Sequence, residues 1–149
     1  SKMKMVALRP CDDLKDKAFA EATAIMNANP GVKLLMNICS PAVPGAAEAV
    51  KQARKVGQVK VIGLGLPSEM RDFVKDGTVT AFQLWSPYNE GWLAAHFAKG
   101  VLDGTISNTV GGTFEVPNLG TITINENNMM IAQDELTTFD INNIDDFSF

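Results

Sequence analysis

Short apolar runs alternate with segments in which apolar residues recur at three- and four-residue spacing over the first half of the chain. The apolar runs lie at residues 4–8, 32–39, 59–63 and 79–84. Runs of this length, bounded by Gly and Pro, are typical of strands that are buried on both faces of a sheet. The segments between them predict helices over residues 12–29, 44–55 and 68–77.

The helix ends carry signals of their own. We expect Asp12 or Asp13 to cap the first helix, and Pro44 suits the first turn of the second. Ser68 is expected to cap the third helix, which should end at Gly77 in the left-handed conformation. Strand and helix therefore alternate in the order β-α-β-α-β-α-β.

This alternation predicts an α/β fold with a mainly parallel sheet. Right-handed crossovers between parallel strands put helices on both faces, which gives a three-layer α/β/α arrangement. The loops that follow the strands then share the carboxyl edge of the sheet, where open α/β sheets bind ligands. These loops are residues 9–12, 39–44, 63–68 and 85–89.

The pattern changes after the fourth strand. Residues 88–102 predict a long helix whose apolar side chains are Trp92, Leu93, His96, Phe97 and Val101. Alternating residues around the turn at 117–120 predict a C-terminal β-hairpin, and residues 129–133 predict one more short strand. The acidic tail keeps three apolar side chains that can anchor it, namely Ile144, Phe147 and Phe149.

Composition narrows the class of protein. The 149 residues fit a single domain, residues 1–149, and 46% of them are apolar, which suffices for a core. A net charge of −4 argues against a nucleic-acid or anionic-membrane partner. No apolar run approaches the roughly 20 residues that span a bilayer. Residues 1–10 lack the apolar core of a signal peptide, so a removed leader, a start inside a longer gene and a cytosolic location all stay open.

Residue patterns for catalysis, cofactors or metals are weak. His96 is the single histidine and lies among apolar helix residues, with no second ligand nearby in sequence. The glycines of residues 63–67 lack the spacing and the downstream acid of a dinucleotide-binding loop. Cys11 and Cys39 permit one disulfide that their spacing does not demand. We therefore predict a protein that is not an enzyme and has no cofactor and no metal.

Two stretches are more specific, namely SPAVPGAAEAVKQA at residues 40–53 and GLPSEMRDFVKDGTVTAFQLWSP at residues 65–87. Both resemble periplasmic sugar-binding proteins of bacterial ABC transporters, and most closely the subgroup that binds rhamnose or the autoinducer-2 signal. The closing TTFDINNIDDFSF resembles the tail of that subgroup. The resemblance implies the C-terminal lobe of a two-lobed type I periplasmic binding protein and a periplasmic or extracytoplasmic location.

The resemblance also implies where a ligand binds. Pro44 and Ala46 match family positions whose backbone meets the ligand, and Trp85 can either stack on a sugar ring or belong to the core. The expected ligand-binding residues are Ser40, Pro44, Ala46, Trp85 and Ser86.

The chain departs from the family at some of its anchoring groups. Cys39 and Pro41 stand where relatives often carry Asp and Asn, and Ser86 replaces an Asp that follows the tryptophan in many of them. The remaining anchoring groups of such proteins come from the N-terminal lobe, which this chain does not contain.

The resemblance has a consequence for assembly. In relatives the helix at residues 88–104 packs on the N-terminal lobe, so without that lobe Trp92, Leu93 and Phe97 would face water. An exposed apolar patch predicts an interface, with a second copy in a homo-oligomer or with a separate N-terminal lobe.

The leading hypothesis is therefore binding of a small sugar or sugar-derived signal as half of an ABC-transporter substrate-binding protein, which would meet the transporter's membrane subunits. The alternative is a stand-alone half-lobe that has lost sugar binding and serves as a self-assembling or interaction module. The effector domain of a transcription repressor shares this fold, but the chain has no helix-turn-helix pattern.

Overall fold

The computed structural model describes residues 3–126 and 136–149. The chain forms two compact units, the first made of residues 1–84 and 138–149 and the second of residues 85–137. Each unit has its own cluster of buried apolar side chains. The predicted strand at residues 129–133 lies outside the described residues.

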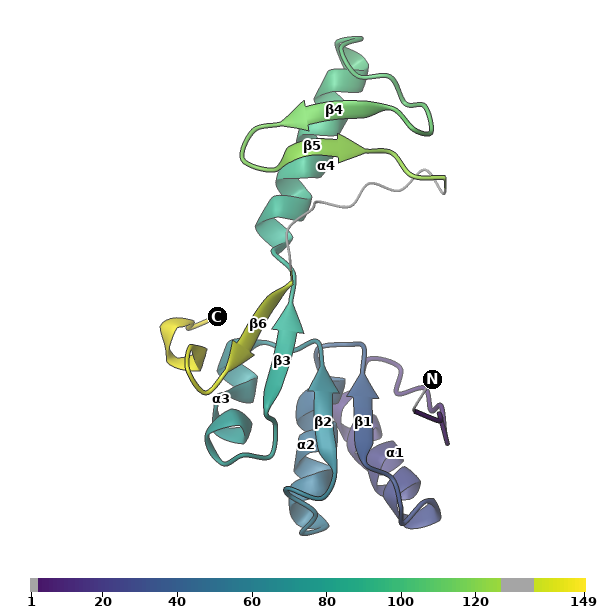
Figure 1. Ribbon diagram of the computed structural model, residues 1–149, viewed down its shortest axis with the longest axis vertical. Coiled ribbons are helices and arrows are strands. Elements are labelled where there is room, and N and C mark those ends of the chain that lie inside the picture. The colour runs from purple at the N-terminus through teal and green to yellow at the C-terminus, as the bar shows by residue number, and fades with distance from the viewer. Residues whose placement is uncertain (1–2, 127–135) are drawn as a thin grey trace. The chain divides into compact units, whose positions relative to one another are not determined.

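The sheet of the first unit is mainly parallel, as predicted. Its strands are β1 (Leu34–Asn37), β2 (Lys60–Gly63), β3 (Ala81–Leu84) and β6 (Thr137–Asp140). β1 pairs with β2 in parallel, and parallel bridges from Val61 to Val79 and from Leu64 to Gln83 join β2 to β3. β6 pairs with β3 and runs in the opposite direction (Figure 1).

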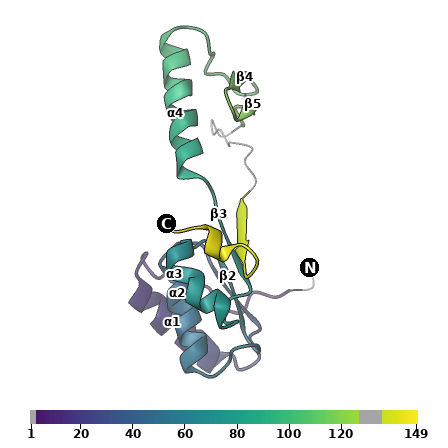
Figure 2. The same ribbon diagram turned by 90° about the vertical axis from the view of Figure 1, so that its left-hand side faces the viewer.

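Three helices cover this sheet. They are α1 (Lys15–Ala28), α2 (Ala42–Gln52) and α3 (Pro67–Lys75). The sequence predicted helices on both faces of the sheet, whereas these three helices lie on the same side of the strands (Figures 1 and 2). α2 also lies against α1, where a Cβ at Gly45 would be 2.4 Å from the carbonyl oxygen of Lys15. The small residues of α2 thus permit close packing with a helix as well as with the sheet.

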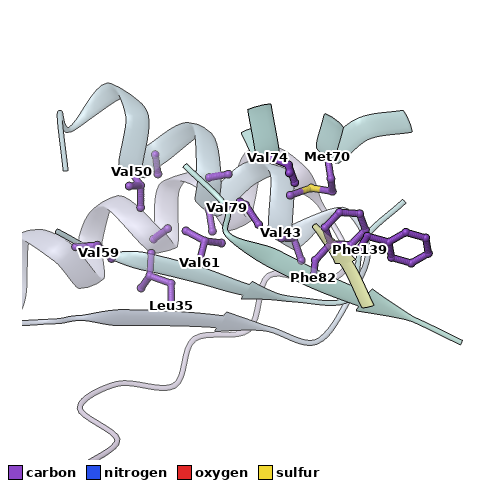
Figure 3. Close-up of a cluster of buried hydrophobic side chains, with 14 of the residues drawn as sticks. Leu35, Val43, Val50, Val59, Val61, Met70, Val74, Val79, Phe82 and Phe139 are labelled. Carbon is purple, nitrogen blue, oxygen red and sulfur yellow. The ribbon is translucent and has the colours of Figure 1, made fainter. Parts of the chain in front are cut away.

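Strands and helices of the first unit meet in one apolar core (Figure 3). The C-terminal tail closes this core, because Phe139 stacks on Phe82 with ring centroids 5.0 Å apart. Ile144, in the short 3₁₀ helix η1 (Ile144–Asp146), is fully buried, and Phe147 packs edge-on against Phe139. The prediction that apolar side chains anchor the acidic tail is confirmed.

The predicted strand at residues 4–8 is wrong for this structure. The segment has no regular structure, and Leu8 is 81% exposed. A strand needs a neighbour for its backbone N–H and C=O groups, and none of the described strands pairs with this segment.

Two predicted helix caps are also wrong. Leu14 precedes α1 without a side-chain cap, while Asp12 and Asp13 adopt left-handed backbone conformations in the turn before it. Leu66 stands at the N-cap of α3, because Pro67 starts that helix one residue before Ser68. Proline suits this first position, since its missing N–H would have no helical partner there.

The second unit packs a hairpin against a helix. Its elements are α4 (Pro87–Leu102), β4 (Thr113–Val116) and β5 (Gly120–Thr123). β4 and β5 are antiparallel, which confirms the predicted hairpin, and its turn places Asn118 and Gly120 at positive φ. The Trp92 indole N–H donates a hydrogen bond to the Pro117 carbonyl oxygen at 3.0 Å.

The hairpin changes the expectation for the apolar face of α4. Leu93 is buried with Val116 and Ile122, and the Phe97 ring lies 5.5 Å from the ring of Phe114. These two side chains therefore do not face water as expected, because the hairpin covers them. Trp92 remains partly exposed.

Candidate functional site

The carboxyl ends of β1, β2 and β3 lie at one edge of the sheet (Figure 1). The backbone at this edge is tightly packed, because the Leu64 N–H donates to the Asn37 carbonyl oxygen at 3.2 Å. Gly63 has φ +151°, and a Cβ at this residue would lie 1.9 Å from the same carbonyl oxygen. Only glycine allows this close approach of the two strand ends.

Ser40 lies at this edge, as the sequence predicts. It belongs to the turn between β1 and α2, which the Ala42 N–H closes by donating to the Cys39 carbonyl oxygen at 3.1 Å. Ser40 is half-buried, and its hydroxyl makes no hydrogen bond within the part of the chain that the structure describes. A serine hydroxyl is both a donor and an acceptor, so it suits the hydroxyl group of a sugar.

Pro44 and Ala46 lie within α2, as the predicted helix at residues 44–55 implies. α2 begins at Ala42, two residues before the predicted start. Both are buried, and Ala46 belongs to the apolar core of the first unit. Their side chains serve packing in this structure.

Trp85 and Ser86 belong to the second unit and follow β3 directly in sequence. Trp85 is 39% exposed, so part of its ring is open to contact. The Ser86 hydroxyl oxygen caps α4 by accepting a hydrogen bond from the Asn89 N–H at 3.3 Å. The hydroxyl of Ser86 can still donate its own hydrogen.

Cys11 and Cys39 meet at the carboxyl edge, although they are 28 residues apart, and their Sγ atoms lie 3.6 Å from each other. Burial, together with hydrogen bonds with Cys11 and Asp13, raises the pKa of the Cys39 thiol to about 11. The sequence left the relation of these cysteines open, because only the arrangement of the sheet brings their two segments together.

Side chains suited to metal binding do not gather in the described residues, where no three His, Cys, Asp or Glu side chains form a group that could hold an ion. His96 lies beside Trp92, with ring centroids 6.3 Å apart. The described helices include none with the length and apolar character needed to cross a membrane.

Solved structures share this architecture. A sugar ABC transporter protein from Actinomyces odontolyticus has a TM-score of 0.79 and 36% identity, over 98% of this chain and 46% of that one. An ABC transporter solute-binding protein from Clostridium phytofermentas, solved with bound L-rhamnose, has a TM-score of 0.82 and 27% identity, over 97% of this chain and 49% of that one. The fold is that of type I periplasmic binding proteins.

Sequence comparison leads to the family itself. Residues 1–106 match the family described as periplasmic binding protein domain, so the chain belongs to that family. The D-allose-binding periplasmic protein of Escherichia coli is 36% identical over 92 residues, which are 61% of this chain and 29% of that protein. The chain thus spans less than half the length of the relatives named above. These homologues are sugar-binding proteins of ABC transporters, a class of substrate-binding, non-enzymatic proteins.

Proposed function

We propose that this chain is part of an ABC-transporter substrate-binding protein and binds a small sugar or sugar-derived signal without converting it. The observation that carries the proposal is the Ser40 hydroxyl, which follows β1 at the carboxyl edge of parallel strands and has no hydrogen-bond partner among the described residues. In open α/β sheets this edge is where ligands bind. The family match over residues 1–106 supports the same assignment.

The first ligand to test is L-rhamnose, which is bound in one of the similar structures. The sequence resemblance adds autoinducer-2, and the relative from Escherichia coli adds D-allose. The periplasmic name of that relative supports an extracytoplasmic location. The ABC transporter proteins among the similar structures support an interaction with the membrane subunits of a transporter.

The proposed contacts differ in kind. Ser40 would exchange hydrogen bonds with a sugar hydroxyl. Pro44 and Ala46 stay proposed as neighbours of the ligand on the family resemblance alone, because both residues are buried within α2 and Ala46 is 0% exposed. Trp85 would stack its partly exposed ring on the C–H face of the sugar, and Ser86 would donate its hydroxyl hydrogen.

Calorimetric titration of the protein with L-rhamnose, D-allose and autoinducer-2 tests this proposal. We expect saturable heat in the millimolar range for one of the three ligands. Ser40→Ala should weaken binding about 2- to 12-fold, the equivalent of roughly 0.5–1.5 kcal/mol for one hydrogen bond. Ser107→Ala is the matched control, since Ser107 is an exposed serine that belongs to neither of the two predicted loops.

The titration can also contradict the proposal. Heats that stay flat for all three ligands would count against an autonomous sugar site. An equal loss of affinity in the Ser40→Ala and Ser107→Ala variants would remove Ser40 from the site.

A role in assembly is the second candidate, and exposed apolar side chains favour it. Met36 on β1 is 70% exposed and Ile38, which follows β1, is 77% exposed. β1 also pairs on one side only within the described strands, and such an edge can pair with another chain. The partner would be a second copy or a separate N-terminal lobe. Of the predicted interface residues Trp92, Leu93 and Phe97, Trp92 would remain the proposed contact of the second unit, because the hairpin covers the other two. Native mass spectrometry tests self-association, and a strictly monomeric protein that binds no apolar dye would contradict it.

A further inference from the structure

Two thiols from distant parts of the sequence lie in contact at the carboxyl edge. Cys11 belongs to the segment before α1, and Cys39 to the turn between β1 and α2. Their Sγ atoms are 3.6 Å apart, and both residues are half-buried, as free cysteines. A disulfide has an S–S bond of about 2.05 Å, so the two sulfurs need to approach by about 1.5 Å.

Local turns hold each thiol in its place. The Leu14 N–H donates to the Cys11 carbonyl oxygen at 2.9 Å, and the Ala42 N–H donates to the Cys39 carbonyl oxygen at 3.1 Å. Both backbones are therefore fixed by short-range hydrogen bonds, while the side chains meet across a long stretch of chain. Such an arrangement brings the thiols together before any bond between them exists.

We infer that Cys11 and Cys39 form a reversible disulfide that ties the segment before α1 to the loop that carries Ser40. The oxidant is a small-molecule disulfide such as oxidised glutathione. The Cys11 thiolate attacks one of its sulfur atoms, which forms a mixed disulfide and releases one glutathione thiolate. Cys39 then loses its proton and attacks the Cys11 Sγ, which forms the internal bond and releases the second glutathione. Two protein thiols are oxidised to one disulfide, and one glutathione disulfide is reduced to two thiols.

The surroundings assign the two sulfurs different roles. Burial, together with hydrogen bonds with Cys11 and Asp13, raises the pKa of Cys39 to about 11, and so this thiol is protonated at neutral pH and attacks slowly. Once the mixed disulfide has formed on Cys11, Cys39 is the nearest thiol to it. The inference does not depend on sugar binding, but the bond would lie one residue from Ser40 and fix that loop.

The bond also has a consequence for stability. It would close a loop that contains α1 and β1, because its two cysteines are 28 positions apart in the sequence. Loop-closure entropy for this length shifts the folding equilibrium by roughly 400-fold toward the folded state. The bond would attach the chain to the domain at Cys11, three residues after the exposed Leu8.

The test equilibrates the full chain with mixtures of reduced and oxidised glutathione and then alkylates all free thiols. We expect intact mass to show loss of both alkylation sites together, with no glutathione retained. In Cys39→Ser, a stable glutathione adduct should accumulate on Cys11, whereas Cys11→Ser should stay largely unmodified. Denaturant unfolding should show higher stability for the oxidised protein, and the double variant Cys11→Ser/Cys39→Ser should give the same stability under both conditions.

Three results would overturn the inference. The first is a wild-type protein that keeps both thiols open to alkylation in oxidised glutathione. The second is a wild-type protein that stops at the glutathione adduct, and the third is oxidation that yields only dimers linked between chains. Because thiol counting needs no sugar, a negative titration with sugars leaves this test unaffected.

Discussion

Phe139 should be the side chain that fastens the C-terminal tail to the first unit, and its replacement by alanine tests this. The side chain is 2% exposed, and its ring stacks on Phe82 and meets Phe147 edge-on with centroids 4.8 Å apart. Truncation of a buried phenylalanine to alanine costs about 3–5 kcal/mol. The two close aromatic pairs account for roughly 1–3 kcal/mol of this, at roughly 0.5–1.5 kcal/mol each. Since domains are stable by roughly 5–15 kcal/mol, Phe139→Ala should remove a large part of the stability of the unit.

Urea unfolding followed by far-ultraviolet circular dichroism measures this loss. The matched control is Ile141→Ala, because Ile141 is two residues away in the same tail and is 60% exposed. The control should change stability by less than about 0.5 kcal/mol. If Phe139→Ala and Ile141→Ala unfold at the same urea concentration, the tail is not part of the core and the reasoning fails.

Two further substitutions test the edge of the sheet and an ionised contact. In thermal unfolding, Gly63→Ala should cost at least about 2 kcal/mol of stability, because it combines a strained backbone with a backbone clash. Gly31→Ala is the control and should be nearly neutral in the same assay, because no atom lies within 4 Å of a Cβ at that position. Burial alone would raise the pKa of Asp76, but hydrogen bonds from Lys51 and Thr78 outweigh it and lower that pKa below 3.8. The ionised Asp76 carboxylate therefore adds stability that is fully present above its unfolded-state pKa and is lost as the pH falls through its lower folded-state pKa. Asp76→Asn should lower the urea midpoint of unfolding at neutral pH, and that midpoint should fall less in acid than it does for the wild-type protein. If the midpoint of the variant depends on pH in the same way as that of the wild type, Asp76 does not have this role.

The order of elements could be predicted from the sequence, because buried strands and amphipathic helices have different apolar spacings. The strands expected at 32–39, 59–63 and 79–84 correspond to β1, β2 and β3. The segment at residues 4–8 has the same apolar character but forms no strand. Apolar spacing reports the tendency of a segment to be buried, whereas a strand also needs a partner, and a single run of residues contains no information about that partner.

The candidate site was harder to predict than the order of the elements. α2 starts at Ala42 and not at Pro44, and its packing buries both Pro44 and Ala46. Helix boundaries are the part of a sequence prediction most prone to errors of a few residues. Ser40 keeps its predicted place, because the end of β1 fixes it. The contact between Cys11 and Cys39 depends on how two segments approach in space, which their spacing in sequence does not specify.

The energies of the proposed contacts explain why the rest of a two-lobed protein matters for a sugar. One hydrogen bond from Ser40 contributes roughly 0.5–1.5 kcal/mol, and a dissociation constant of 1 mM already requires about 4 kcal/mol. Stacking on Trp85 and the donor of Ser86 are proposed as further contacts, each of a similarly small size. The chain covers 46% and 49% of the two similar structures named above, so the groups that tighten binding would come from the remaining half. We therefore expect weak but selective binding by this chain and a large gain in affinity when a complementary lobe encloses the ligand.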